Sequence, residues 1–278
     1  YDAEKIESIL GGYFDIVKTE DINKASIAIL VTCAIREKAE HKVYSLLGQW
    51  NIVKKKNNMI IAVGGCVASQ EGKALQQNCP FVSIVFGPQT LHRLPYLINK
   101  YSTSGGKKQI DISFPKIEKF DYIPYERVKK NTVVANLSVM EGCSKFCSYC
   151  IVPYTRGEEI SRPFDDVMME AISLEKTGAK EIILLGQNVN DYRYQRSNDS
   201  TYIDLAYLIK HIASLKGIKR IRYTTSHPTA FSDHLINLYS VTNKLVKHLH
   251  LPVQSGSNRI LTLMKRGYTV EEYKYKIK

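Results

Sequence analysis

The sequence predicts an α/β protein, with an N-terminal βαβ domain built on a parallel sheet and, after it, a partial (β/α) barrel. Short apolar runs alternate with segments of helical periodicity over residues 26–97, and the alternation begins again at residue 133. Such alternation is typical of βαβ units. Cysteines or polar residues follow several of the apolar runs, and in open α/β sheets ligands bind at the carboxyl edge of the strands.

The first half of the chain contains three βα units. Each predicted strand is a run of four to six mostly apolar residues, and each predicted helix keeps its apolar side chains on one face. The predicted strands are 26–31, 59–64 and 82–85, and the predicted helices are 36–53, a segment from about residue 68, and 90–99. We therefore expect a domain over 1–100.

Residues 101–130 lose this pattern. The stretch contains Gly105, Gly106, Pro115 and Pro124 among scattered charges, a composition typical of connecting segments. We interpret it as a linker before a second domain over 131–278.

The second half begins with a predicted strand at 133–140. A helix follows, with Pro163 in its first turn, Asp165 and Asp166 near its positive end, and Gly178 at its C-terminus. Further predicted strands are 181–185, 220–225 and 248–253, and further predicted helices are 202–215, 232–241 and a segment from 268 to the end. An eightfold barrel takes about 250 residues, so we expect a partial barrel, in a chain that is cut at both ends.

Composition and charge limit the function classes. Lys and Arg number 39 against 27 Asp and Glu, a net charge of +12, which favours a polyanionic partner such as nucleic acid over a basic surface kept for solubility. The hydrophobic content of 44% excludes disorder as the main state. No apolar run approaches the ~18 residues of a membrane span, and six unevenly spaced cysteines favour a reducing, cytoplasmic setting.

Three of these cysteines lie in one loop after the predicted strand 133–140. Cys143, Cys147 and Cys150 are four and three residues apart. Three neighbouring thiolates hold three irons of a 4Fe-4S cubane and leave the fourth iron open. Structural zinc is the alternative, but it requires four ligands and usually a second Cys or His pair, which the loop does not offer.

The loop, Cys143-Ser-Lys-Phe-Cys147-Ser-Tyr-Cys150, resembles the signature of radical S-adenosylmethionine (SAM) enzymes. In that superfamily SAM binds the open iron, and an electron from the cluster cleaves it to a 5′-deoxyadenosyl radical. Further segments resemble the MiaB-type tRNA methylthiotransferases along nearly the whole chain, namely those beginning at Val31, Gly64, Phe86, Pro153, Leu185 and Leu251. That family adds a methylthio group to carbon 2 of N6-isopentenyladenosine beside the anticodon.

The resemblance implies a second, auxiliary 4Fe-4S cluster that carries sulfur. Cys33 and Cys66 match two of its three ligands, and the segment that carries the third would precede Tyr1. The family's RNA-binding TRAM domain and last barrel strands are also expected beyond this chain. Cys79 matches no ligand position and is expected to be a small buried or surface thiol.

Other polar residues follow predicted strands of the second domain. They stand at the same sheet edge as the cysteine loop, so we consider them for binding SAM or the substrate base, against a plain turn role: Gln187, Asn188, Asn190, His227 and Gln254. Arg156 and Arg162, which bracket Glu158 and Glu159, are interpreted as balancing cluster charge or binding RNA phosphate, or else as exposed ion pairs. No residue is assigned to proton transfer.

The predicted partners follow from the resemblance. They are the anticodon loop of tRNA, a flavodoxin- or ferredoxin-like electron donor, and proteins that deliver iron-sulfur units or sulfur. The protein is expected to be a monomer and not to bind a membrane. Two alternatives stay open: a sister methylthiotransferase acting on threonylcarbamoyl-adenosine or a ribosomal protein aspartate, and a non-catalytic RNA-binding protein with zinc.

Overall fold

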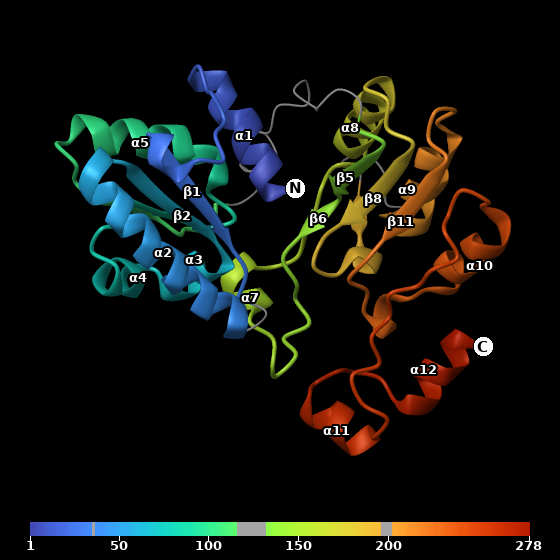
Figure 1. Ribbon diagram of the computed structural model, residues 1–278. Coiled ribbons are helices and arrows are strands. Elements are labelled where there is room, and N and C mark those ends of the chain that lie inside the picture. Colours follow the sequence, from blue (N-terminus) through green and yellow to red (C-terminus); the bar gives the residue numbers. More distant parts are fainter. Residues whose placement is uncertain (35–36, 116–131, 196–201) are drawn as a thin grey trace. The chain divides into compact units, whose positions relative to one another are not determined.

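The computed structural model describes residues 1–34, 37–115, 132–195 and 202–278, without the side chains of 37–40 (Figure 1). The chain divides into two compact units. One contains residues 2–124 with 154–156, and the other contains residue 1 with 125–153 and 157–278. Each unit is built around its own parallel sheet.

The sheet of the first unit has four parallel strands in the order β1-β2-β3-β4. They are β1 (Ile27–Thr32), β2 (Ile60–Gly65), β3 (Ile84–Phe86) and β4 (Gln109–Asp111). The helices are α1 (Asp2–Tyr13), α2 (Glu37–Asn57), α3 (Cys66–Glu71), α4 (Lys73–Asn78) and α5 (Leu94–Thr103), with 3-10 turns η1 (Ile22–Lys24) and η2 (Leu91–Arg93). The three predicted βα units are therefore present, and α1 is an element for which the sequence carried no prediction.

Both faces of this sheet are buried, because alternate residues of the strands pack against different helices. Ile61 and Val63 of β2 pack with side chains of α2, α3 and α4, whereas Ala62 between them packs with α1 and α5. Figure 1 shows this three-layer arrangement, with α1 and α5 on one side of the blue and teal sheet. Strands buried on both faces read as continuous apolar runs, which is the pattern seen in the sequence.

The predicted linker over 101–130 is wrong in its first part. Residues 101–103 complete α5, and β4 pairs with β3 in the register Val85↔Ile110. A three-residue strand is too short to show a periodicity, and Ile110 is only partly buried against the core. The sequence pattern therefore did not predict β4. Residues 116–130 lie outside the described residues.

The sheet of the second unit has three parallel strands in the order β11-β8-β5. They are β5 (Val134–Ser138), β8 (Glu181–Leu185) and β11 (Arg220–Tyr223). The helices α8 (Phe164–Lys176), α9 (Leu205–Ser214) and α10 (Asp233–Val241) belong to the same core as the buried side chains of these strands. This arrangement of strand and helix is the predicted partial barrel.

Short elements complete the second unit. The antiparallel pairs are β6 (Met140–Glu141) with β7 (Ile160–Ser161), and β9 (Arg193–Gln195) with β10 (Tyr202–Asp204). The remaining helices are α7 (Val152–Arg156), which extends into the first unit, η3 (Val189–Asp191), η4 (Pro228–Ala230), α11 (Asn258–Leu263) and α12 (Val270–Ile277).

Two predictions for the second half need correction. Residues 248–253 form no strand: the chain meets β11 only at the bridge Ile221↔Leu245 and then turns away, with the His248 amide bonded to Val246 O at 2.7 Å. Its apolar residues reflect packing, since Leu251 is buried in the core. The helix predicted from 202 begins at Leu205, because Asp204 ends β10 and caps the helix by accepting from the Tyr207 amide.

In the described parts of the chain, no helix has the length and apolarity that crossing a membrane would need.

The close approach of β2 and β3 gives a first prediction. A Cβ added to Gly64 would lie 2.1 Å from the Phe86 ring, whereas one added to Gly48, inside α2, meets no atom within 4 Å. Gly64→Ala is expected to lower the free energy of unfolding by about 1–3 kcal/mol through overpacking. Gly48→Ala is expected to raise it by about 0.5–1 kcal/mol through helix propensity. Urea unfolding of both variants checks this, and equal effects would contradict the packing.

Candidate functional site

The cysteine loop leaves the sheet edge between β6 and β7. Gly142 has φ +76°, and an added Cβ would lie 1.9 Å from the carbonyl oxygen of Glu158, so only glycine fits where the two chain segments meet. The Cys143 amide donates to Gly157 O at 3.2 Å, and Phe146 takes a left-handed backbone with φ 48°. These two left-handed residues and the backbone hydrogen bond fix the course of the loop.

The three thiols of the loop differ in exposure. Cys147 is buried, whereas Cys143 and Cys150 are half-buried. Burial raises the pKa of the Cys143 thiol, and the nearby Glu159, Cys150 and Cys147 raise it further. Among the described residues, no three His, Cys, Asp or Glu side chains are placed to hold one single metal ion.

Two of the predicted residues use their polar side chains to join neighbouring loops of the edge. Gln187, after β8, accepts from the Gly142 amide at 2.7 Å, which ties it to the start of the cysteine loop. Asn190 donates to His227 O at 2.8 Å and accepts from the His227 amide at 2.9 Å. Their side chains therefore hold the edge together.

Asn188 and His227 each keep one buried polar atom without a hydrogen-bond partner in the described structure, Oδ1 of Asn188 and Nε2 of His227. His227 Nδ1 accepts from the Thr229 amide at 3.3 Å and lies 2.7 Å from the Thr229 hydroxyl oxygen, and with both of these groups donating to Nδ1 the proton of the neutral ring is on Nε2. Burial, followed by the nearby Arg266 and Lys145 charges, lowers the pKa of His227 to about 3, so the ring is neutral. The pair offers a ligand one acceptor and one donor.

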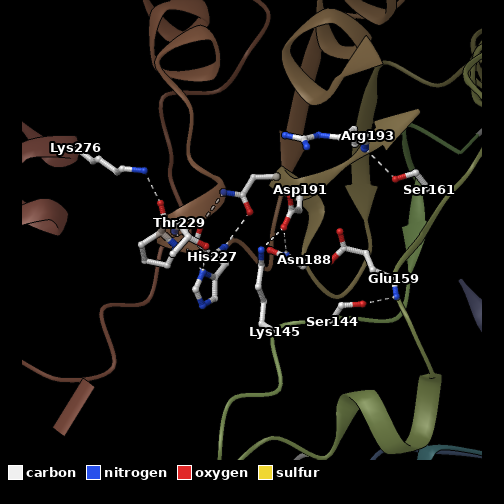
Figure 2. Close-up of polar contacts among 12 residues, drawn as sticks. Ser144, Lys145, Glu159, Ser161, Asn188, Asp191, Arg193, His227, Thr229 and Lys276 are labelled. Carbon is white, nitrogen blue, oxygen red and sulfur yellow. Dashed lines mark hydrogen bonds and ion pairs between the residues drawn. The ribbon is translucent and has the colours of Figure 1, made fainter. Parts of the chain in front are cut away.

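Figure 2 shows three charged residues beside this pair: Lys145 and Asp191, which the sequence analysis did not select, and Glu159, which it named only between Arg156 and Arg162. Lys145 Nζ is 2.5 Å from Asp191 Oδ2, and the amide nitrogen of Asn188 donates to Asp191 at 3.0 Å and to Glu159 at 3.2 Å. Burial, followed by the negative charge of Asp191, raises the pKa of Glu159 to about 7. Lys145 and Asp191 are close in sequence to predicted residues, and this closeness is the signal that could have identified them.

The two remaining candidates of the second unit, Gln254 and Arg162, differ in exposure and contacts. Gln254 is exposed, with a left-handed φ of 68°, and none of the described contacts among the edge residues includes it. Arg162 is fully buried and bonds Glu170 at 2.8 Å and Ser138 O at 2.6 Å. Arg162 is therefore not part of an exposed ion-pair set, and a fully buried guanidinium is not placed to bind RNA phosphate.

Cys33 and Cys66 lie at the carboxyl edge of the first sheet. Thr32 and Gly65 are the last paired residues of β1 and β2, Cys33 follows β1, and Cys66 is the first residue of α3. The Thr32 hydroxyl donates to Gly64 O at 2.7 Å, and a Cβ at Gly65 would lie 2.4 Å from Thr32 O. Cys33 is exposed and Cys66 is buried.

Cys79 and Arg156 are also residues of the first unit. Cys79 ends α4 in the core, where burial raises its pKa. It is therefore a buried thiol, one of the two alternatives that were expected. Arg156 bonds Asp2 at 3.0 Å within the same unit.

His227 gives a prediction for stability. Because its pKa is about 3 in the folded chain and about 6.5 when unfolded, acid protonates the unfolded form first, and stability is lost as pH falls from about 6.5 towards 3. His227→Gln is expected to flatten this part of the stability curve, whereas His248→Gln, at an exposed position, leaves it unchanged. Urea unfolding at several pH values measures both, and parallel curves for His227→Gln and the parent chain would refute the assignment.

Comparison with known proteins follows the same division of the chain. The model of the radical SAM superfamily matches residues 137–278, slightly more than half of the chain, and that of the uncharacterized protein family UPF0004 matches residues 1–87. Two structures of TsrM, a radical SAM methyltransferase from Kitasatospora setae, share the fold at 12% and 14% identity. The TM-scores are 0.60 and 0.61, over 99% and 91% of this chain and 56% of that one.

Curated relatives match along the whole chain. Proteins called tRNA-2-methylthio-N(6)-dimethylallyladenosine synthase are 57% identical in Legionella pneumophila (strain Corby) and 56% identical in Paraburkholderia phytofirmans, over 100% and 99% of this chain. The chain spans 62% and 60% of their lengths. With its cysteine loop at the edge of a parallel sheet and the family model matched from β5 onwards, the chain belongs to the radical SAM superfamily.

Proposed function

We propose that this chain is the catalytic part of a tRNA methylthiotransferase that converts N6-isopentenyladenosine to 2-methylthio-N6-isopentenyladenosine. The observation that carries the proposal is the 57% identity along the whole chain to relatives whose name states that product. The net charge of +12 supports a nucleic-acid substrate. An adenosine in an anticodon loop is readily unstacked into a pocket.

The loop thiols fit a 4Fe-4S cluster better than a single ion. A cubane presents separate irons, so its thiolate ligands do not have to meet at one point. Cys147 and Cys150 are close enough to raise the pKa of Cys143, yet among the described residues the three thiols do not converge on the position of a single metal ion. When bound, the cluster supplies the electron for reductive cleavage of SAM. The protein supplies three ligands and a loop whose course is fixed by Gly142 and its contact with Gln187.

Asn188 and His227 are proposed to bind SAM or the target base through their unpartnered atoms. Asn188 Oδ1 accepts from an amine or hydroxyl, and His227 Nε2 donates to a carbonyl, a carboxylate or a ring nitrogen. The neutral state of His227 suits this role, because burying a neutral hydrogen-bond donor away from water costs less free energy than burying a charged one. Gln187 and Asn190 position the loops around them, and Gln254 stays a predicted contact.

Cys33 and Cys66 are proposed as ligands of the auxiliary cluster that carries the sulfur. Their adjacent positions after Thr32 and Gly65 support a shared site, because the paired strands fix the distance between the two backbones. Cys33 is exposed, which leaves room for a substrate sulfur to approach.

The proposed partners are the anticodon loop of tRNA, a flavodoxin- or ferredoxin-like electron donor, and proteins that deliver iron-sulfur units or sulfur. We also propose a monomer that acts in the cytoplasm, where tRNA is modified.

Removal of one loop thiol tests the proposed chemistry. Cys147→Ala is expected to lose about four irons per chain and to abolish formation of 5′-deoxyadenosine from SAM under reducing conditions. Cys79→Ala, a buried thiol outside both edges, is the matched control and is expected to keep both. Iron and sulfide analysis after anaerobic reconstitution, with chromatography of the nucleosides, measures this. Deoxyadenosine formation by Cys147→Ala at the parent rate would overturn the assignment.

The substrate is tested in a strain that lacks the gene. Mass spectrometry of its tRNA nucleosides is expected to show loss of 2-methylthio-N6-isopentenyladenosine with accumulation of the isopentenyl precursor, and restoration by the complete gene. Loss of a methylthiolated threonylcarbamoyl-adenosine instead would favour the sister enzyme. Zinc without iron or sulfide in the anaerobically prepared protein would favour a binding protein.

A further inference from the structure

The turn that follows α11 directs an arginine into the interior of the second unit. The Arg266 amide donates to Leu261 O at 3.0 Å and closes the end of the helix. Its neighbours Lys265 and Gly267 both have left-handed backbones, with φ of 55° and 69°. The Arg266 side chain is only 5% exposed.

This arginine contacts the buried cysteine of the loop. Arg266 Nη1 donates to Cys147 Sγ at 3.2 Å, across 119 residues of sequence. The guanidinium carbon lies 5.6 Å from the centre of the Tyr268 ring, which covers part of its charge. The nearby phenol of Tyr149 interacts with the same guanidinium.

The same turn holds the loop by its backbone. The Ser148 amide donates to Met264 O at 3.1 Å, and its hydroxyl donates to Leu263 O at 3.0 Å. Residues 263–266 therefore fix both the backbone next to Cys147 and the sulfur of Cys147. An isolated cation at this depth is costly unless it faces an anion, and a neutral thiol is a weak acceptor.

We infer that Arg266 is a positioning residue that holds the Cys147 sulfur by a hydrogen bond and raises the reduction potential of the cluster bound by the loop. The inference rests on the proposed function. Reduction adds one electron, supplied by a low-potential reductant, and arginine keeps its proton throughout. A fixed positive charge with a hydrogen bond to a cluster sulfur favours the more negative, reduced state, because charge and such bonds set the potentials of these clusters.

The experiment measures the midpoint potential of a single cluster. A Cys33→Ala/Cys66→Ala parent chain leaves the loop thiols as the ligands, so only one cluster contributes to the signal. Arg266→Met removes the charge at similar length, Arg266→Gln keeps a donor without charge, and Arg266→Lys keeps a charge without the planar fork. Arg259→Met, at an exposed position on α11, is the matched control.

Redox titration followed by electron paramagnetic resonance is expected to give a more negative midpoint for Arg266→Met and Arg266→Gln. The ratio of reduced to oxidised cluster at a fixed potential is expected to fall about tenfold, which is about 59 mV for one electron. Arg266→Lys is expected to lie between these variants and the parent, and Arg259→Met to equal the parent. A folded Arg266→Met chain that loses iron, while Arg266→Lys retains it, would also support the inference.

Two results would contradict it, and they differ in what else they overturn. Clusters with the parent midpoint in both Arg266→Met and Arg266→Gln would overturn the inference alone. A parent chain that binds no iron would overturn the proposed function and the inference together.

Discussion

The parallel hydrogen-bond register of the two sheets is the constraint on which both candidate sites depend. In a parallel pair the carboxyl ends lie at the same edge, so the residues that follow paired positions become neighbours whatever their distance in sequence. Cys33 and Cys66 each follow a member of the pair Thr32↔Gly65, and Ser138↔Leu185 precedes the start of the cysteine loop and Gln187, which meet at Gly142. A slip of one residue in either register would separate these groups. The apolar strand residues that fix the register are therefore also what assembles the sites.

Two buried arginines of the second unit show how the same side chain takes a structural or a functional role. Arg162 faces a carboxylate, Glu170, and a backbone carbonyl, so its charge is balanced by groups that are present in the chain itself. Arg266 instead donates to a sulfur, that of Cys147, and lies against the ring of Tyr268. Its charge is therefore directed at one of the three thiols proposed to hold the cluster, and the inference drawn for Arg266 depends on this arrangement.

The sequence predicted the parts of the fold that repeat and missed those that occur once. The strand 181–185 was placed at its observed bounds, and the helix at 232–241 nearly so, because an apolar period or a capping serine marks them. The strand β4 and the irregular course of 248–253 were missed or wrong, since three residues carry no period and Leu251 is buried without a strand. Cys143, Cys147 and Cys150 were predicted as cluster ligands from their spacing, Cys33 and Cys66 from the family resemblance, and the polar residues from their places after predicted strands. Arg266 was not, because its contact with Cys147 joins residues far apart in sequence that no local pattern relates.

The hydrogen bonds within the edge separate residues that can bind a ligand from residues that hold the loops. The Gln187 side-chain carbonyl accepts from the Gly142 amide, and both ends of the Asn190 side-chain amide bond the backbone of His227. Rotating either side chain towards a ligand would therefore break a hydrogen bond. Each such bond is worth about 0.5–1.5 kcal/mol, and more if a buried group is left unpaired. Asn188 and His227 have that freedom at one atom each. The four residues looked equivalent in the sequence, since each follows a predicted strand. In the structure Gln187 and Asn190 bond the backbone of neighbouring loops, whereas Asn188 and His227 each keep one buried polar atom for the proposed ligand.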